Sequence, residues 1–218
     1  MTAGAGRRRA VSEEDKSQRR DQIMAAAKEV FARKGFHETT IADIAKQAGL
    51  AYGSVYWYFQ SKDELFHALM AVEETALREH IASALSGVVG TDGSEATLRT
   101  LLERSVLATL EYFEADKATA KLLLRDPYAL GERFERHLGG IYERFIDHLE
   151  TFVVTAQERG EVVAAPPRMA AYSLAALVGQ LAHRRLSTDD GVTAAQVTDF
   201  VVALVLDGLR PRADELAT

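Results

Sequence analysis

The most constraining feature of this sequence is a pair of short helix patterns joined by a glycine, between residues 40 and 58. Thr40 and Asp43 have the spacing of an N-terminal capping pair, and the helix they open is predicted to end at Gly49. Gly49 stands where a tight turn needs a positive φ angle. A second short helix is predicted over about 52–58. Two short helices joined in this way predict a helix-turn-helix.

The interior of this segment has residues that suit two crossing helices. Ala45 is small enough to let the helices touch. Ile44, Leu50 and Val55 have the spacing to fill the space between this pair and a preceding helix.

Helix signals cover nearly all the rest of the chain, so we predict an all-α fold of about nine helices. The sequence contains neither the alternating pattern of a strand nor an internal repeat. Caps, glycines and prolines place the helices at about 16–34, 40–48, 52–58, 61–85, 95–114, 117–125, 131–159, 166–187 and 193–209.

We expect three parts: an arm over 1–16, a helix-turn-helix domain over 17–62 and a larger helical domain over 63–218. The arm is predicted to be disordered and contains Arg7-Arg8-Arg9, which is either a solubilising tail or a contact to DNA phosphate. Through Lys62 the chain has eleven basic and seven acidic residues, and beyond it fifteen and twenty-five. A basic segment through Lys62 followed by an acidic remainder fits a protein that contacts phosphate through its N-terminal segment alone.

Composition and motifs argue against several other classes of protein. There is no cysteine, and no apolar run reaches the ~18 residues of a membrane span, so we expect a cytoplasmic protein that does not bind membranes. The six histidines lack paired ligand spacing, and no Walker or Gly-x-Ser-x-Gly motif is present. We therefore expect no metal, no cofactor and no enzymatic activity.

The second short helix is too rich in aromatic residues for an ordinary protein surface. Tyr52, Tyr56, Trp57 and Tyr58 cannot all be buried on two turns, and an exposed aromatic cluster indicates a contact. We interpret Tyr58 and Phe59 as core residues of the small domain. The other three could lie in a DNA major groove, on thymine methyls and phosphates. A helical adaptor or small-molecule-binding protein without DNA binding is the main alternative, and it would leave these aromatics unexplained.

The order of these motifs resembles the DNA-binding domain of the TetR family over about residues 18–70. It is carried by Thr39-Thr40-Ile41, Ile44-Ala45, Ala48-Gly49-Leu50, Gly53-Ser54-Val55-Tyr56, Tyr58-Phe59 and Ser61-Lys62-Asp63-Glu64-Leu65. The resemblance implies a homodimeric repressor that binds a palindromic double-stranded operator and is released by a small effector. Carried over position by position, it implies DNA contacts from Thr40, Tyr52, Gly53, Ser54, Tyr56, Trp57 and Lys62. Position 52, often Lys or Arg in this family, is tyrosine here, which indicates an apolar or thymine-directed contact.

The larger domain contains apolar stripes with two possible uses. Stripes on the last two helices could form a dimer interface or an internal core face. They comprise Ala175, Gly179, Ala182, Val197, Phe200, Val201, Leu204 and Val205. A second set could line an effector cavity, although such stripes are often plain core. It comprises Leu107, Leu110, Phe113, Leu123, Arg125, Tyr128, Phe145, Leu149, Phe152 and Tyr172.

The segment over 122–128 with 131–134 is similar to the acyl-CoA-responsive branch of the TetR family. That resemblance implies an apolar or amphipathic effector, such as a fatty acyl-CoA, with Arg125 or Arg133 near its anionic head.

Overall fold

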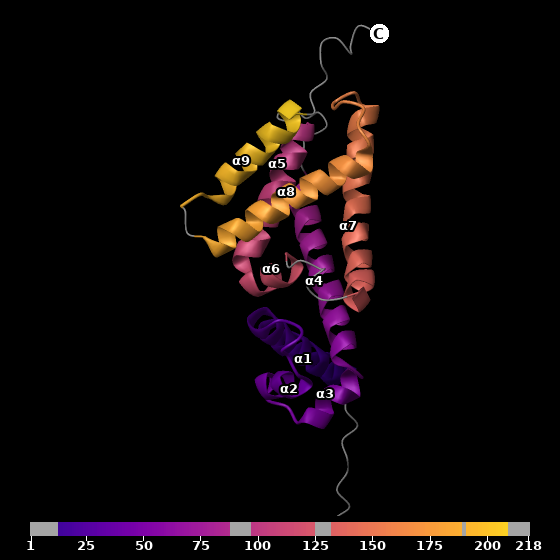
Figure 1. The fold of residues 1–218 in the computed structure, drawn as a ribbon, viewed down its shortest axis with the longest axis vertical. Helices are drawn as coiled ribbons and strands as arrows, with labels where there is room; N and C mark the ends of the chain where they lie inside the picture. The colour runs from indigo at the N-terminus through magenta and orange to yellow at the C-terminus, as the bar shows by residue number, and fades with distance from the viewer. Residues whose placement is uncertain (1–12, 88–96, 125–131, 189–190, 209–218) are drawn as a thin grey trace, which may run out of the picture. The chain divides into compact units, whose positions relative to one another are not determined.

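The computed structural model of this protein describes residues 13–87, 97–124, 132–188 and 191–208; the side chains of 132–139, 141, 207 and 208 are not described. Within these ranges all regular structure is helical, which confirms the predicted all-α class (Figure 1). The helices are α1 Glu13–Lys34, α2 Ile41–Ala48, α3 Tyr52–Tyr58, α4 Lys62–Leu85, α5 Leu98–Ala115, α6 Lys117–Leu123, α7 Glu132–Glu158, α8 Pro167–Ser187 and α9 Ala194–Gly208.

The first helix begins earlier than the sequence predicted. Residues 13–16, assigned to a disordered arm, form the first turn of α1. Glu13, Glu14 and Asp15 lie in that turn, where negative charge is stabilised by the helix dipole. The Lys16 ammonium also lies 2.5 Å from the Glu13 carboxylate. The Arg7-Arg8-Arg9 run lies outside the described residues.

The chain divides into two compact units, residues 1–69 and 70–218, with the division inside α4. The first unit has a core of fully buried side chains from α1, including Ile23, Val30 and Phe31. The Phe31 ring packs against two further phenylalanines, with ring centroids 5.8 Å from Phe36 and 4.9 Å from Phe66. This aromatic cluster supports the helix-turn-helix.

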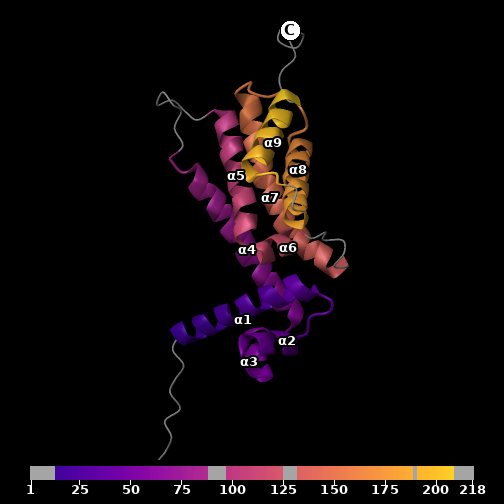
Figure 2. The same ribbon diagram turned by 90° about the vertical axis from the view of Figure 1, so that its left-hand side faces the viewer.

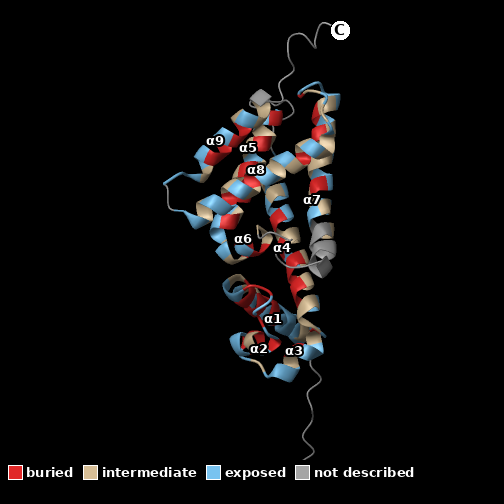
Figure 3. Cartoon of the chain, in the orientation of Figure 1, coloured by how far each residue is buried: buried red, intermediate tan, exposed pale blue. Residues whose placement is uncertain are grey.

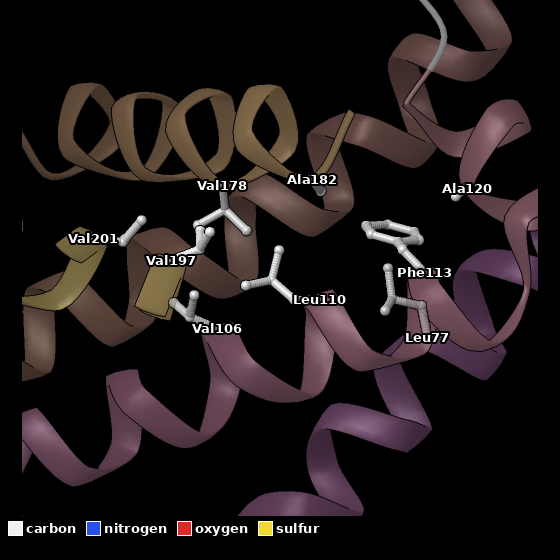
Figure 4. Packing of buried hydrophobic residues seen from close by; sticks show 9 residues of the cluster. All are labelled: Leu77, Val106, Leu110, Phe113, Ala120, Val178, Ala182, Val197 and Val201. Carbon is white, nitrogen blue, oxygen red and sulfur yellow. The ribbon is translucent and has the colours of Figure 1, made fainter. Parts of the chain in front are cut away.

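The second unit is built around α5, α8 and α9, which pack on one another, with α7 against α8 (Figure 2). Buried residues line the inward faces of these helices, and exposed residues lie on the outward faces (Figure 3). The larger core cluster joins five helices and is drawn in Figure 4. It comprises Leu77, Val106, Leu110, Phe113, Ala120, Val178, Ala182, Val197 and Val201.

A buried polar link joins α6 to α4 inside the second unit. Thr119, which is fully buried, donates from its hydroxyl to the carboxylate of the buried Glu73 at 2.6 Å. Asp116 caps α6 by accepting from the backbone N–H groups of Ala118 and Thr119, both at 3.0 Å. Buried polar groups need such partners, so this link specifies how α6 packs.

A charged cluster joins α7 to α8 on the surface of the same unit. Arg168 bridges to Asp147 at 2.9 Å and to Glu150 at 2.7 Å, and it also contacts Glu143. No helix among the described residues has the length and apolar character needed to cross a membrane.

Candidate nucleic-acid interface

The turn between α2 and α3 has the geometry that the sequence predicted. Thr40 and Asp43 form a complete capping box: the Thr40 hydroxyl accepts from the Asp43 N–H at 3.1 Å, and Asp43 accepts from the Thr40 N–H at 3.0 Å. Gly49 has φ of 67°, in the left-handed region, and its N–H donates to carbonyls of α2. Leu50 closes the turn by donating to the Ala45 carbonyl at 2.9 Å. A residue other than glycine would be strained at this position.

The interior of the helix-turn-helix is apolar, as predicted. Ile44 and Val55 are fully buried, and Ala45 is buried where a small side chain was expected. Leu50 is half-buried. On the α1 side, the Gln22 amide donates to the Ala48 carbonyl at 2.8 Å and so ties α1 to the end of α2.

The outward face of α3 is aromatic and exposed. Tyr52, Tyr56 and Trp57 expose 53%, 40% and 66% of their surfaces. Phe59 is buried, as predicted for a core residue, and Tyr58 is half-buried beside Trp57. Burial on the inner side of α3 comes from Val55. The helix therefore presents rings to solvent that its own core does not need.

The backbone next to Tyr52 is open. Gly53 is exposed, and a Cβ added there would meet no atom within 4 Å. Ser54 next to it is half-buried. This side of α3 therefore lets another molecule approach the backbone closely.

Thr40 is exposed at the start of α2, but its hydroxyl is engaged with Asp43. The Lys34 ammonium, 2.7 Å from the Asp43 carboxylate, and the hydrogen bonds from Thr40 hold the pKa of Asp43 at about 2. Asp43 is therefore ionised at neutral pH, and Lys34 offsets its charge.

Lys62 lies in a different environment from the phosphate anchor that the family resemblance implied. Its ammonium donates to three backbone carbonyls: Phe36 at 2.8 Å, His37 at 3.2 Å and Thr39 at 2.7 Å. It also lies 4.3 Å from the centroid of the Phe36 ring. Burial lowers the pKa of Lys62. A lysine has three N–H donors, and these are all used inside the protein, so Lys62 fastens the turn before α2 to the start of α4.

Two basic residues of α1 that were not predicted as site residues lie beside α3. The Lys16 ammonium is 6.0 Å from the centroid of the Trp57 ring. Arg19 lines a shallow depression together with Gln18, Gln22, Asp15 and Tyr58. Residues 16 and 19 are one turn apart and therefore share a helix face. That spacing could have drawn attention to them, but their position beside Trp57 depends on tertiary packing.

The residues predicted for the second unit fall into separate environments. Of the residues predicted for a dimer interface or a core face, Ala182, Val197 and Val201 are buried in the unit's own core, so the core alternative holds for these three. Phe200 and Leu204 are exposed, at 58% and 51%. Ala175, Gly179 and Val205 are half-buried, and Val205 packs against the core clusters.

The predicted effector residues are likewise dispersed. Leu110 and Phe113 are core residues (Figure 4), and Leu123 packs against their cluster. Phe152 packs against a second cluster around Leu102, and Leu107, Phe145 and Leu149 are half-buried. Tyr172 donates to Glu143, which raises the pKa of Tyr172. Arg125 and Tyr128 lie outside the described residues, as does the Arg133 side chain.

The three-helix core, the glycine turn and the exposed face of α3 define a helix-turn-helix DNA-binding domain. Residues 23–69 match the model of the family described as bacterial regulatory proteins, tetR family. Residues 23–69 are therefore a DNA-binding domain of the TetR type.

Known relatives agree with this assignment. The transcriptional regulator TtgR of Pseudomonas putida is 40% identical over 74 residues, 34% of each chain. The match thus spans about a third of that relative's length. The transcriptional activator FasR of Mycolicibacterium smegmatis is 26% identical over 89% of this chain and 84% of FasR. These relatives are regulators, in agreement with the expectation that the chain is not an enzyme.

The fold is similar to that of solved structures over most of the chain. FadR of Bacillus subtilis, in complex with stearoyl-CoA, superposes with a TM-score of 0.76 at 20% identity, over 87% of this chain and 99% of FadR.

Proposed function

We propose that this protein is a homodimeric transcriptional regulator that binds an operator through α3 and is released from it by a small effector. The observation that carries the proposal is the exposed aromatic face of Tyr52, Tyr56 and Trp57 beside an open backbone at Gly53. On the neighbouring helix α1, Lys16 and Arg19 supply positive charge that can attract DNA phosphates. Thr40 and Ser54 remain candidate contacts to DNA. Lys62 instead holds the turn before α2 to the start of α4.

The DNA contact is tested by replacing Tyr56 with alanine. We expect Tyr56→Ala to weaken binding to DNA from upstream of its own gene about tenfold, equivalent to ~1.4 kcal/mol, with an unchanged circular dichroism spectrum. Tyr142→Ala is a matched control, because Tyr142 is 39% exposed but belongs to the second unit. Equal affinity of Tyr56→Ala and the wild type would contradict the proposal.

The salt dependence of binding separates a regulator from a helical adaptor. Phosphate contacts release counterions, so the logarithm of the affinity should fall linearly with the logarithm of salt concentration. Lys16→Ala and Arg19→Ala should each make that slope shallower by about one. An adaptor would show no such binding.

For the dimer, we propose that a second copy of the chain covers Phe200 and Leu204. These residues are four apart on α9, so they share a face, and both leave a large apolar side chain in solvent. The neighbouring helix α8 presents the small residues Ser173 and Ala176 to solvent one turn apart, which would allow close helix approach. The interface proposed here thus excludes the core residues Val197 and Val201.

Replacing Phe200 with aspartate tests this interface. We expect Phe200→Asp to convert a dimer into a monomer in light scattering. Val72→Asp should remain dimeric, because Val72 is 44% exposed on α4, away from the proposed face in sequence. A Phe200→Asp dimer as tight as the wild type would exclude the α9 face.

For the effector, we propose an amphipathic molecule with a long apolar chain. The proposal is supported by the fold shared with FadR, whose structure contains stearoyl-CoA. A long-chain acyl-CoA should raise the melting temperature and weaken DNA binding in the same concentration range, since ligand that prefers one state shifts the population towards it. Free coenzyme A is the control, and an effect of coenzyme A equal to that of the acyl-CoA would exclude recognition of the apolar chain.

A further inference from the structure

Two of the exposed tyrosines of α3 form a joined pair. The rings of Tyr52 and Tyr56 lie with centroids 5.0 Å apart and planes inclined by 59°. The Tyr52 hydroxyl donates to the Tyr56 hydroxyl, with the oxygens 3.2 Å apart. The residues are four apart on one helix, so their side chains lie on the same face.

The direction of this hydrogen bond gives the two oxygens different roles. A phenol has one hydrogen to donate and lone pairs with which to accept. Because the Tyr52 hydroxyl donates its hydrogen to Tyr56, the Tyr52 oxygen can only accept a hydrogen bond from a third group. Tyr56 keeps its own hydrogen for another acceptor. This hydrogen bond is the first cause of the raised pKa of Tyr52.

The two roles suit different parts of a DNA duplex. Phosphate oxygens only accept, so they fit the Tyr56 hydroxyl. In the major groove, an acceptor fits the amino group of adenine or cytosine, and is mismatched with the O6 and N7 of guanine and the O4 of thymine. An aromatic edge also gains apolar contact with a thymine methyl. Only an A·T pair presents an amino group and a methyl together in that groove.

We propose that Tyr52 and Tyr56 act as one specificity unit that selects an A·T base pair. The Tyr52 Oη accepts from the adenine N6 amino group, its ring packs on the thymine methyl, and the Tyr56 hydroxyl donates to a neighbouring phosphate. The exposed Gly53 next to Tyr52 leaves room for the base edge. This inference rests on the proposed function, because it specifies what the α3 face reads.

The experiment starts from duplexes selected by the full-length protein out of a random pool. We expect one fixed A·T position in each half-site of the selected duplexes. Purine in place of that adenine, which removes the N6 amino group, should weaken wild-type binding about fivefold, the value of one hydrogen bond. Tyr52→Phe should weaken binding to the natural duplex by a similar factor and be insensitive to the purine substitution. Uracil in place of thymine should weaken both proteins.

Two results would overturn the inference while leaving the proposed function intact. One is a selected set without a fixed A·T pair. The other is a Tyr52→Phe protein that keeps the full sensitivity to loss of the amino group. Tyr142→Phe is the control for loss of an exposed hydroxyl outside α3. Failure to select any duplex would overturn the proposed function together with this inference.

Discussion

Both units of this protein bury apolar residues in a core, but they differ in where their exposed apolar side chains lie. In the first unit, the exposed rings of Tyr52, Tyr56 and Trp57 cannot be explained by packing, and they converge on one face of a short helix. In the second unit many large apolar residues belong to the core, and the exposed Phe200 and Leu204 lie on α9, whose other face is buried. Residues that packing does not account for therefore carry most of the functional information.

The units also differ in how polar side chains fasten them. The first unit uses Lys62, half-buried and near the surface, to hold three carbonyls of an irregular turn. The second unit uses Thr119 and Glu73, deep between two helices. Backbone carbonyls without helical partners need such donors, whereas helices that satisfy their own backbone need only side-chain links.

The largest expected effect would show whether the two cores are independent. Phe31→Ala should cost about 3–5 kcal/mol of stability, and Leu110→Ala about 2–5 kcal/mol, because both leave cavities in buried cores. Trp57 is the single tryptophan of the sequence, so its fluorescence reports on the first unit alone. We expect Phe31→Ala to shift the urea midpoint of Trp57 fluorescence and Leu110→Ala to shift mainly that of circular dichroism. Identical shifts by both probes for both variants would indicate one cooperative unit.

A smaller effect tests the structural role given to Lys62. Lys62→Met should cost about 2–3 kcal/mol, because charged hydrogen bonds to three carbonyls are lost. Urea unfolding followed by Trp57 fluorescence measures this loss, and the exposed Lys46→Met is the matched control. The salt slope of DNA binding should be unchanged in Lys62→Met. A slope shallower by about one with normal stability would instead restore Lys62 as a phosphate anchor.

Lys62 also illustrates what could be predicted from the sequence alone. The capping box at Thr40, the turn at Gly49 and the bounds of α3 follow from local rules about caps, positive φ angles and periodicity, and they were confirmed. The partners of Lys62 lie 23 to 26 residues away in the chain, in a turn whose carbonyls point at α4 only after folding. No local rule identifies such a contact.

The same limit explains why the sequence left two uses open for the apolar stripes of the second unit. Val197, Phe200, Val201 and Leu204 form one apolar stripe by spacing, but the packing of α5 against α9 buries Val197 and Val201 and leaves the other two exposed. Spacing defines a face only to within about a third of the helix circumference. Spacing alone therefore does not separate the core residues of that stripe from the exposed ones.

A still smaller effect separates folding from DNA binding within α3. Gly53→Ala should raise the stability of the first unit by about 0.5–1 kcal/mol, since glycine is unfavourable in a helix and the added methyl meets no atom within 4 Å. The same methyl would obstruct close approach of a duplex, so DNA affinity should fall. Thermal melts and gel-shift titrations on one preparation measure both effects. Unchanged or tighter binding would show that Gly53 is not at the contact surface.

The smallest expected effect concerns Asp43, the half-buried carboxylate at the start of α2. The pKa of Asp43 is about 2, below its ordinary value of 3.8, because Lys34 and Thr40 stabilise the charged form. A lowered pKa in the folded state means that the charge stabilises the fold above about pH 4 and that this contribution is lost as the pH falls towards 2. The melting temperature of the wild type should therefore exceed that of Asp43→Asn at neutral pH, and the difference should shrink over that acidic range. A difference that stays constant down to pH 2 would indicate that the capping hydrogen bonds, and not the charge paired with Lys34, carry the effect.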